Sequence, residues 1–183
     1  MDSIEQKNKF VEFYSISKGT SYSTVKQMIK NTQIKIEQVQ LNEIGEINKL
    51  LYLSKGYWDY DRIFMDKFMK GFSITEDYLK ANSVFSCYYN FVLAGFFAFS
   101  NTNDKLELDY FFISPQYIGK GIGKQLWNYC CHIAQEKYNR NYFTLWSDPN
   151  AENFYTKMGC KKIGSKKSNL LLNRDAPILE YWI

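Results

Sequence analysis

The chain has 183 residues, a length typical of one domain with its own hydrophobic core and short for two. Hydrophobic residues make up 45% and aromatic residues 18%, which excludes an intrinsically disordered chain. The formal net charge is a modest +4, and the sequence lacks the concentrated basic face typical of nucleic-acid-binding proteins.

No apolar run approaches the roughly 20 residues needed to cross a bilayer, and the N-terminal residues do not resemble a signal peptide. We therefore expect a cytoplasmic protein without a membrane partner. The cysteine pattern agrees with a reducing compartment, because Cys130 and Cys131 are adjacent while Cys87 and Cys160 stand apart. These residues and the single His132 lack metal-ligand spacing, so no metal cofactor is expected.

Residues 1–33 are polar, and we interpret them as an N-terminal extension that packs on the domain or on a second subunit. The main domain is expected at residues 34–183. Its first element is a predicted strand at 34–39, where apolar and polar residues alternate. Asn42 can then cap a helix that runs to residue 53, with apolar residues at helical spacing.

The segment 54–82 is dense in aromatic and acidic residues. Short helices and a loop are predicted there, including a second helix that begins near Thr75. Two β-favouring runs follow, residues 84–89 and 91–100, and they are predicted to form a hairpin around Asn90.

A glycine-punctuated loop, residues 116–124, lies between a predicted strand at 106–113 and an amphipathic helix that begins near Ile122. Such a turn gathers free backbone N–H groups at a helix N-terminus, where the helix dipole adds partial positive charge. The loop is therefore predicted to bind a phosphate group.

Spacing separates three kinds of phosphate-binding loop. A P-loop requires a glycine, four further residues and then Gly-Lys-Ser or Gly-Lys-Thr, and this loop lacks that sequence. The dinucleotide fingerprint Gly-x-Gly-x-x-Gly does not fit Gly119, Gly121 and Gly123, which follow one another at every second residue. A third pattern, Gln/Arg-x-x-Gly-x-Gly/Ala, is matched by Gln116, Gly119 and Gly121.

After the loop and its helix, a strand is predicted at 142–146. Asp148 and Pro149 predict the start of a short helix, because aspartate is a favoured N-cap and proline a favoured first residue. Gly159 is expected to end that helix. The last two strands are predicted at 161–164 and 178–182.

At this point the sequence resembles the GNAT superfamily of acetyl-CoA-dependent N-acetyltransferases. Beside the glycine loop, residues 150–160 are similar to the family segment Asn-Ala-x-x-Phe-Tyr-x-x-x-Gly-Phe, with Cys160 in the last position. The resemblance implies an α/β (α+β) GNAT fold, with a mixed central sheet of about seven strands flanked by about four helices. The predicted elements, in the order β-α-α-β-β-β-α-β-α-β-β, agree with it.

The resemblance also implies a reaction and a cofactor. Acetyl-CoA would donate its acetyl group to a primary amine of a small molecule or protein, by direct attack on the thioester, and CoA would leave. The loop amides would hold the CoA pyrophosphate, and the backbone of the preceding strand would line the pantetheine arm like an added strand. The implied cofactor-binding residues are Phe111, Ile113, Gln116, Ile118, Gly119, Lys120, Gly121, Gly123, Lys124 and Asn150.

Tyr155 is the candidate general acid, because in the matching family position a tyrosine hydroxyl points at the CoA sulfur and can protonate the departing thiolate. Its alternative role is that of a core aromatic residue. Asp109 stands where close relatives have glutamate, and Glu107 lies two residues back on the same predicted strand face. The two are rival bases for the amine proton, or one binds a cationic acceptor, and a surface role for either stays open.

The acceptor pocket is predicted from the family's variable region. Trp58, Asp59 and Tyr60 fall in that region, and their mix of acid and aromatic groups suits a polyamine, an amino sugar or a peptide N-terminus. Ordinary packing is the alternative. Arg174 resembles an arginine that shapes the pocket floor in some relatives.

The leading hypothesis has a rival from another class, a non-catalytic acyl-CoA-binding or sensing module. Asp109, in place of the usual glutamate, keeps that rival open. A structural partner protein that uses residues 1–33 is a third hypothesis. The sequence does not distinguish a monomer from a homodimer or specify the acceptor, because a fold-level likeness says little about substrate.

Overall fold

A computed structural model describes residues 34–102, 105–168 and 175–183, so the predicted N-terminal extension lies outside the described residues. Within these ranges no helix is both long and apolar enough to cross a bilayer. The strands are β1 (Ile34–Gln38), β2 (Ser83–Tyr89), β3 (Val92–Thr102), β4 (Lys105–Ile113), β5 (Tyr142–Trp146), β6 (Lys161–Lys167) and β7 (Asp175–Trp182). The α-helices are α3 (Ile44–Gly56), α4 (Arg62–Phe72), α5 (Glu76–Ala81), α6 (Ile122–Glu136) and α7 (Glu152–Lys157). Short 3-10 turns are η1 (Leu41–Glu43), η2 (Pro115–Tyr117) and η3 (Pro149–Ala151).

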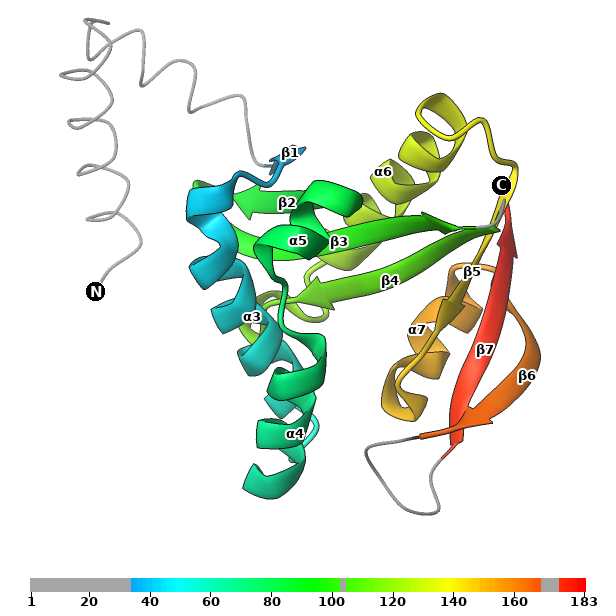
Figure 1. The fold of residues 1–183 in the computed structure, drawn as a ribbon. Coiled ribbons are helices and arrows are strands. Elements are labelled where there is room, and N and C mark those ends of the chain that lie inside the picture. Colours follow the sequence, from blue (N-terminus) through cyan, green and yellow to red (C-terminus); the bar gives the residue numbers. More distant parts are fainter. Residues whose placement is uncertain (1–33, 103–104, 169–174) are drawn as a thin grey trace, which may run out of the picture.

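All seven strands form one mixed sheet in the order β1-β2-β3-β4-β5-β7-β6 (Figure 1). Only β4 and β5 pair in parallel, and the other neighbours are antiparallel. The predicted hairpin between β2 and β3 is confirmed. Its two loop residues, Asn90 and Phe91, both have positive φ angles (49° and 67°), as a type I′ turn requires.

The predicted α/β fold with about seven strands is confirmed, but three described helices rather than two lie between β1 and β2. The additional helix is α4, in the segment where short helices and a loop were predicted. Asp61 caps it by accepting a hydrogen bond from the Phe64 N–H at 2.8 Å. Phe64, Met65 and Phe68 are buried on its inner side, so α4 is stabilised mainly by packing.

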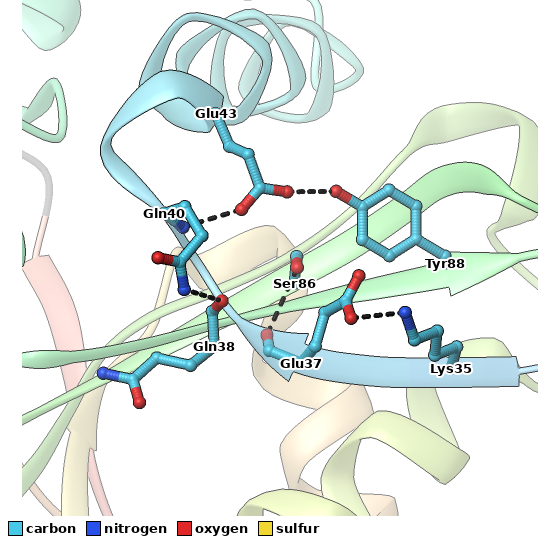
Figure 2. Close-up of polar contacts among 7 residues, drawn as sticks. All are labelled: Lys35, Glu37, Gln38, Gln40, Glu43, Ser86 and Tyr88. Carbon is cyan, nitrogen blue, oxygen red and sulfur yellow. Dashed lines mark hydrogen bonds and ion pairs between the residues drawn. The ribbon is translucent and has the colours of Figure 1, made fainter. Parts of the chain in front are cut away.

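The helix predicted to begin at Asn42 begins later, because η1 precedes it and α3 starts at Ile44. Figure 2 shows the polar contacts at this junction. The Glu43 carboxylate accepts hydrogen bonds from the Gln40 N–H at 2.6 Å and from the Tyr88 hydroxyl on β2. These contacts hold the start of α3 against the sheet.

The core lies on both faces of the sheet, and β3 contributes to both. Phe97 and Phe99 belong to the cluster that includes residues of α6 and α7, whereas Phe96 and Ala98 belong to the cluster that includes residues of α3 and α4. This alternation with a period of two is that of a strand buried on both sides.

The sheet is interrupted between its fourth and fifth strands. On the β3 side, Ala98 pairs with Tyr110 and Phe99 pairs with Leu108, so Asp109 is an extra residue that forms a β-bulge in β4. On the other side, the described ladder between β4 and β5 has two pairs, the second of which joins Leu108 to Leu145. Beyond that pair the two strands diverge (Figure 1).

The strand β6 forms one edge of the sheet, and every one of its residues is exposed. It is longer than predicted and contains Lys161, Lys162, Lys166 and Lys167. The Lys166 ammonium lies 4.0 Å from the centre of the Trp146 ring, at the side of the molecule where β4 and β5 separate.

The close approach of β3 to the end of β4 can be tested at Gly95. A Cβ atom there would lie 2.7 Å from the Phe112 carbonyl oxygen and 2.7 Å from Ile113 Cδ1. We expect Gly95→Ala to lower the free energy of unfolding by about 1–3 kcal/mol through overpacking. The melting temperature should then fall by roughly 2–10 °C in thermal denaturation. Gly45→Ala is the control, because nothing lies within 4 Å of its Cβ position; equal melting temperatures for both variants would contradict the prediction.

Candidate active site

A cavity of about 1000 Å³ lies where β4 and β5 diverge. Residues of α3, α4 and α5 form one wall, η3 and α7 form the opposite wall, and the glycine loop closes one end. The cavity brings together most of the predicted site residues: Trp58, Tyr60, Glu107, Asp109, Phe111, Ile113, Ile118, Gly119, Gly121, Gly123, Lys124, Asn150 and Tyr155.

Three of the predicted residues lie outside the cavity lining. Asp59 is exposed and has a φ of 56°, in the turn after α3, so it shapes the backbone and does not line the cavity. Gln116 and Lys120 are also exposed and lie outside the lining. Arg174 lies outside the described residues.

The glycine loop has the geometry of an anion-binding turn. Gly119 and Gly121 have φ angles of 78° and 81°, which residues with a side chain rarely adopt. Gly121 is the N-cap of the fifteen-residue helix α6, whose first N–H groups lack helical acceptors. A Cβ at Gly123 would lie 3.2 Å from the Phe154 ring, so this glycine permits close packing between α6 and α7. These features fit the pyrophosphate of CoA.

The end of β4 presents an open strand edge to the cavity. Phe111 and Ile113 follow Leu108, where the described pairing with β5 stops. An extended amide chain can bind such an edge through backbone hydrogen bonds. The pantetheine arm of CoA has this chemistry.

Tyr155 belongs both to the core and to the cavity wall. Its ring packs edge-on against Trp127, with centroids 5.8 Å apart, and the residue is 6% exposed. Burial raises the pKa of its hydroxyl well above the usual value of 10, and the neighbouring Cys160, Cys130 and Asp148 add to the rise. The raised pKa keeps the Tyr155 hydroxyl protonated at neutral pH, so it is available as a proton donor.

The short helix that carries Tyr155 is capped at both ends. Asp148 Oδ1 accepts a hydrogen bond from the Asn150 N–H at 2.9 Å, which confirms the predicted start signal, although the first turn is η3. At the other end, the N–H groups of Gly159 and Cys160 donate to the carbonyls of Thr156 and Tyr155, both at 3.0 Å. Gly159 has a φ of 97°, so this end is a Schellman motif, as the glycine predicted.

The two candidate bases differ in their partners. Asp109 Oδ2 accepts a hydrogen bond from the Tyr78 hydroxyl at 2.7 Å, and Oδ1 accepts one from Ser100 at 2.9 Å. Burial raises the pKa of Asp109, and the two hydrogen bonds partly offset that rise. Burial also raises the pKa of Glu107, the charge of Asp109 raises it further, and Lys166 lowers it.

Sequence reasoning missed a buried ion pair in the cavity wall. Lys55 Nζ lies 2.6 Å from Asp148 Oδ2, and the two side chains are 13% and 10% exposed. The Tyr60 hydroxyl donates to the same oxygen at 2.6 Å. Burial alone would raise the pKa of Asp148, but Lys55, Tyr60 and the Asn150 N–H together hold it below its usual value. The partners are 93 residues apart in the chain, and no local pattern connects them.

No group of three His, Cys, Asp or Glu side chains among the described residues could hold a metal ion.

Comparison with known proteins relates this fold to a family. A profile of the acetyltransferase (GNAT) domain matches residues 51–170. No curated protein matches the chain. Among solved structures, the PaiA N-acetyltransferase of Thermoplasma acidophilum in complex with coenzyme A is 18% identical, with a TM-score of 0.68 over 82% of this chain and 99% of that chain.

Two further structures show the same fold. An N-acetyltransferase of Staphylococcus aureus Mu50 is 22% identical, with a TM-score of 0.62 over 81% of this chain and 97% of that one. Arabidopsis thaliana Naa50, in complex with the bisubstrate analogue CoA-Ac-MVNAL, is 15% identical, with a TM-score of 0.60 over 83% and 100% of the two chains. The fold is therefore that of the GNAT acetyltransferases. Because the profile covers well over half of the sequence, the chain belongs to the GNAT family and is an acetyltransferase.

The buried ion pair predicts how stability depends on pH. Asp148→Asn should lower the free energy of unfolding by about 3 kcal/mol at pH 7, because it removes the carboxylate charge 2.6 Å from the Lys55 ammonium. A lowered pKa means that the carboxylate stabilises the fold above the usual pKa of about 4, and that this stabilisation is lost as pH falls through the folded-state value. The difference between wild type and variant should therefore shrink in strong acid, as measured by urea unfolding at several pH values.

Asp66→Asn is the matched control. Asp66 Oδ2 lies 3.8 Å from Arg62 Nε, and its side chain is 69% exposed, so its loss should change the free energy by less than about 0.5 kcal/mol. A penalty for Asp148→Asn that stays constant down to low pH would show that the charge is not its source.

Proposed function

We propose that this acetyltransferase moves the acetyl group of acetyl-CoA to a primary amine of a small molecule or protein, by direct attack of the amine on the thioester. One observation carries the proposal. The split between β4 and β5 brings an anion-binding loop, an open strand edge, a protonated tyrosine and a carboxylate into one cavity. The solved relatives bound to coenzyme A or to a CoA–peptide analogue support this choice of cofactor.

The chain's own residues would divide the work as follows. The amides of the loop at Gly119 and Gly121 hold the pyrophosphate, and the backbone of Phe111 and Ile113 aligns the pantetheine arm. Acetyl-CoA, when bound, supplies the activated acetyl thioester. Tyr155 then donates a proton to the departing sulfur; burial, which raises its pKa, keeps the hydroxyl protonated until that step.

We assign the base to Glu107. Each oxygen of Asp109 already accepts one hydrogen bond, from Tyr78 and Ser100, and these bonds stabilise its ionised form and make it a weaker proton acceptor. Glu107 lines the same cavity, and its raised pKa makes it a stronger proton acceptor than an ordinary carboxylate. Asp109 is then a fixed neighbouring charge that contributes to this raised pKa. The proton taken from the ammonium form of the acceptor goes to Glu107, directly or through water. As the C–N bond forms and the C–S bond breaks, the nitrogen loses a second proton, which restores the Tyr155 hydroxyl through water after Tyr155 has protonated the sulfur.

The acceptor end of the cavity favours an amine with apolar or cationic neighbours. Trp58, Tyr60, Phe72 and Tyr78 contribute aromatic surface to it. A polyamine, an amino sugar and a peptide N-terminus remain the acceptor classes to test. A non-catalytic acyl-CoA sensor would use the same loop and strand edge without turnover.

Binding and turnover can be separated at Tyr155. In thermal denaturation, acetyl-CoA at about 100 times its dissociation constant should stabilise the wild type by about 2.7 kcal/mol, or roughly 5–10 °C, whereas ATP should not. Tyr155→Phe should keep that shift and lower kcat by roughly 100-fold in an assay of CoA thiol release with spermidine, glucosamine and an unblocked peptide. Equal kcat in variant and wild type would remove Tyr155 from the mechanism. If acetyl-CoA raises the melting temperature of the wild type but no CoA thiol is released with any of the amines, the non-catalytic acyl-CoA sensor is favoured.

The assignment of the base predicts the pH profile. Since the base must be ionised, kcat/KM should rise with pH through the pKa of Glu107, and Glu107→Gln should lower the plateau by about 100-fold. Asp109→Asn removes the like charge that raises this pKa, so the acidic limb should move to lower pH while most of the plateau remains. The reverse pattern, with the plateau lost in Asp109→Asn and kept in Glu107→Gln, would make Asp109 the base.

A further inference from the structure

The buried ion pair crosses the cavity between the two halves of the sheet. Lys55 lies near the end of α3, which packs on β3 and β4. Asp148 lies on the other side, between β5 and η3. Their 2.6 Å contact therefore spans the place where β4 and β5 no longer pair.

The cation is also held from the side of α4. Lys55 Nζ lies 5.0 Å from the ring centres of Tyr60 and Phe68 and 5.5 Å from that of Phe64. Three aromatic rings and a carboxylate surround one ammonium group, an arrangement that fixes its position closely. The Tyr60 hydroxyl donates to the same carboxylate oxygen that Lys55 contacts, so α3 and the residue before the α4 N-cap both restrain Asp148.

Asp148 transmits this restraint to the proposed general acid. Its Oδ2 atom faces Lys55 and Tyr60, while Oδ1 accepts the Asn150 N–H and so caps η3. The turn η3 leads directly into the six-residue helix α7, which carries Tyr155. A helix this short is marginal by itself, so its position depends on its caps and its packing.

We infer that Lys55, Tyr60 and Asp148 form a latch across the cavity, which positions Tyr155 relative to β4 for acyl transfer. The inference rests on the proposed function in one respect, the role of Tyr155 as general acid. Lys55, Tyr60 and Asp148 are positioning residues, because they act through the placement of η3 and α7. The latch adds a polar connection to the two residue pairs of the β4–β5 ladder and to the core that both halves of the sheet share, in which the ring centres of Tyr155 and Phe111 lie 6.2 Å apart.

The first test measures position without relying on turnover. Lys55→Met keeps the length and apolar stem of the side chain but removes the charge. Amide hydrogen exchange in residues 149–158 should become about 10-fold faster relative to the amides of β2. Lys162→Met is the matched control, because it breaks an exposed ion pair of 3.1 Å to Glu152 on the same helix and should leave exchange unchanged. Equal protection of residues 149–158 in Lys55→Met and wild type would overturn the latch.

The second test measures catalysis in two backgrounds. In the wild-type background, Lys55→Met should lower kcat by about 10-fold, and the milder Tyr60→Phe should lower it less. The KM for acetyl-CoA should change by less than about threefold in both variants. In a Tyr155→Phe background the same substitutions should change kcat by less than about twofold, because the group that they position is already absent.

The outcomes are distinct. If Lys55→Met or Tyr60→Phe lowers kcat by the same factor in the Tyr155→Phe background as in the wild type, the latch does not act through Tyr155. If Lys55→Met does not fold, Tyr60→Phe, which removes one hydroxyl and keeps the ring, decides both measurements. If the wild type transfers no acetyl group to any amine, the proposed function fails, and hydrogen exchange alone then decides whether the latch positions α7.

Discussion

The strand pairing between β4 and β5 extends over two residue pairs, and the organisation of the cavity depends on this limit. The bulge at Asp109 turns β4 away just where the pairing stops, so the following residues present a strand edge instead of a closed ladder. A continuous sheet would bury that edge and leave no space between α4 and α7. The helices on both faces keep the opening stable, because the core cluster on the α6 and α7 face joins residues of β4, β5 and β7, and the cluster on the α3 and α4 face packs on β2, β3 and β4.

The half-buried carboxylates around the opening are distinguished by their partners. Asp148 contacts an ammonium, Asp109 accepts hydrogen bonds from two hydroxyls, and Glu107 is affected by burial, by the like charge of Asp109 and by Lys166. Groups of one chemical type therefore have different proton affinities within a single cavity. Such separation is how one site can hold a proton donor and a proton acceptor at the same pH.

Local signals predicted local structure well. The caps Asp148 and Gly159 follow from single residues and their neighbours, and the structure confirms them. The length of α4 was not predicted, because its stability comes from aromatic side chains packed against a distant strand. The bulge and the contact between Lys55 and Asp148 were missed for the same reason: each depends on which strands and helices become neighbours, and that is set only by the whole fold.

The exposed strand β6 has a consequence for the behaviour of the protein at high concentration. A free sheet edge offers unpaired backbone groups to other chains and can seed intermolecular β-structure. Four of the seven residues of β6 are lysines, and they flank the exposed Ile163. Two copies of this edge would bring eight like charges together. Its composition therefore opposes self-assembly into fibres, and neutralising those lysines by acetylation or by polyanions would remove that protection.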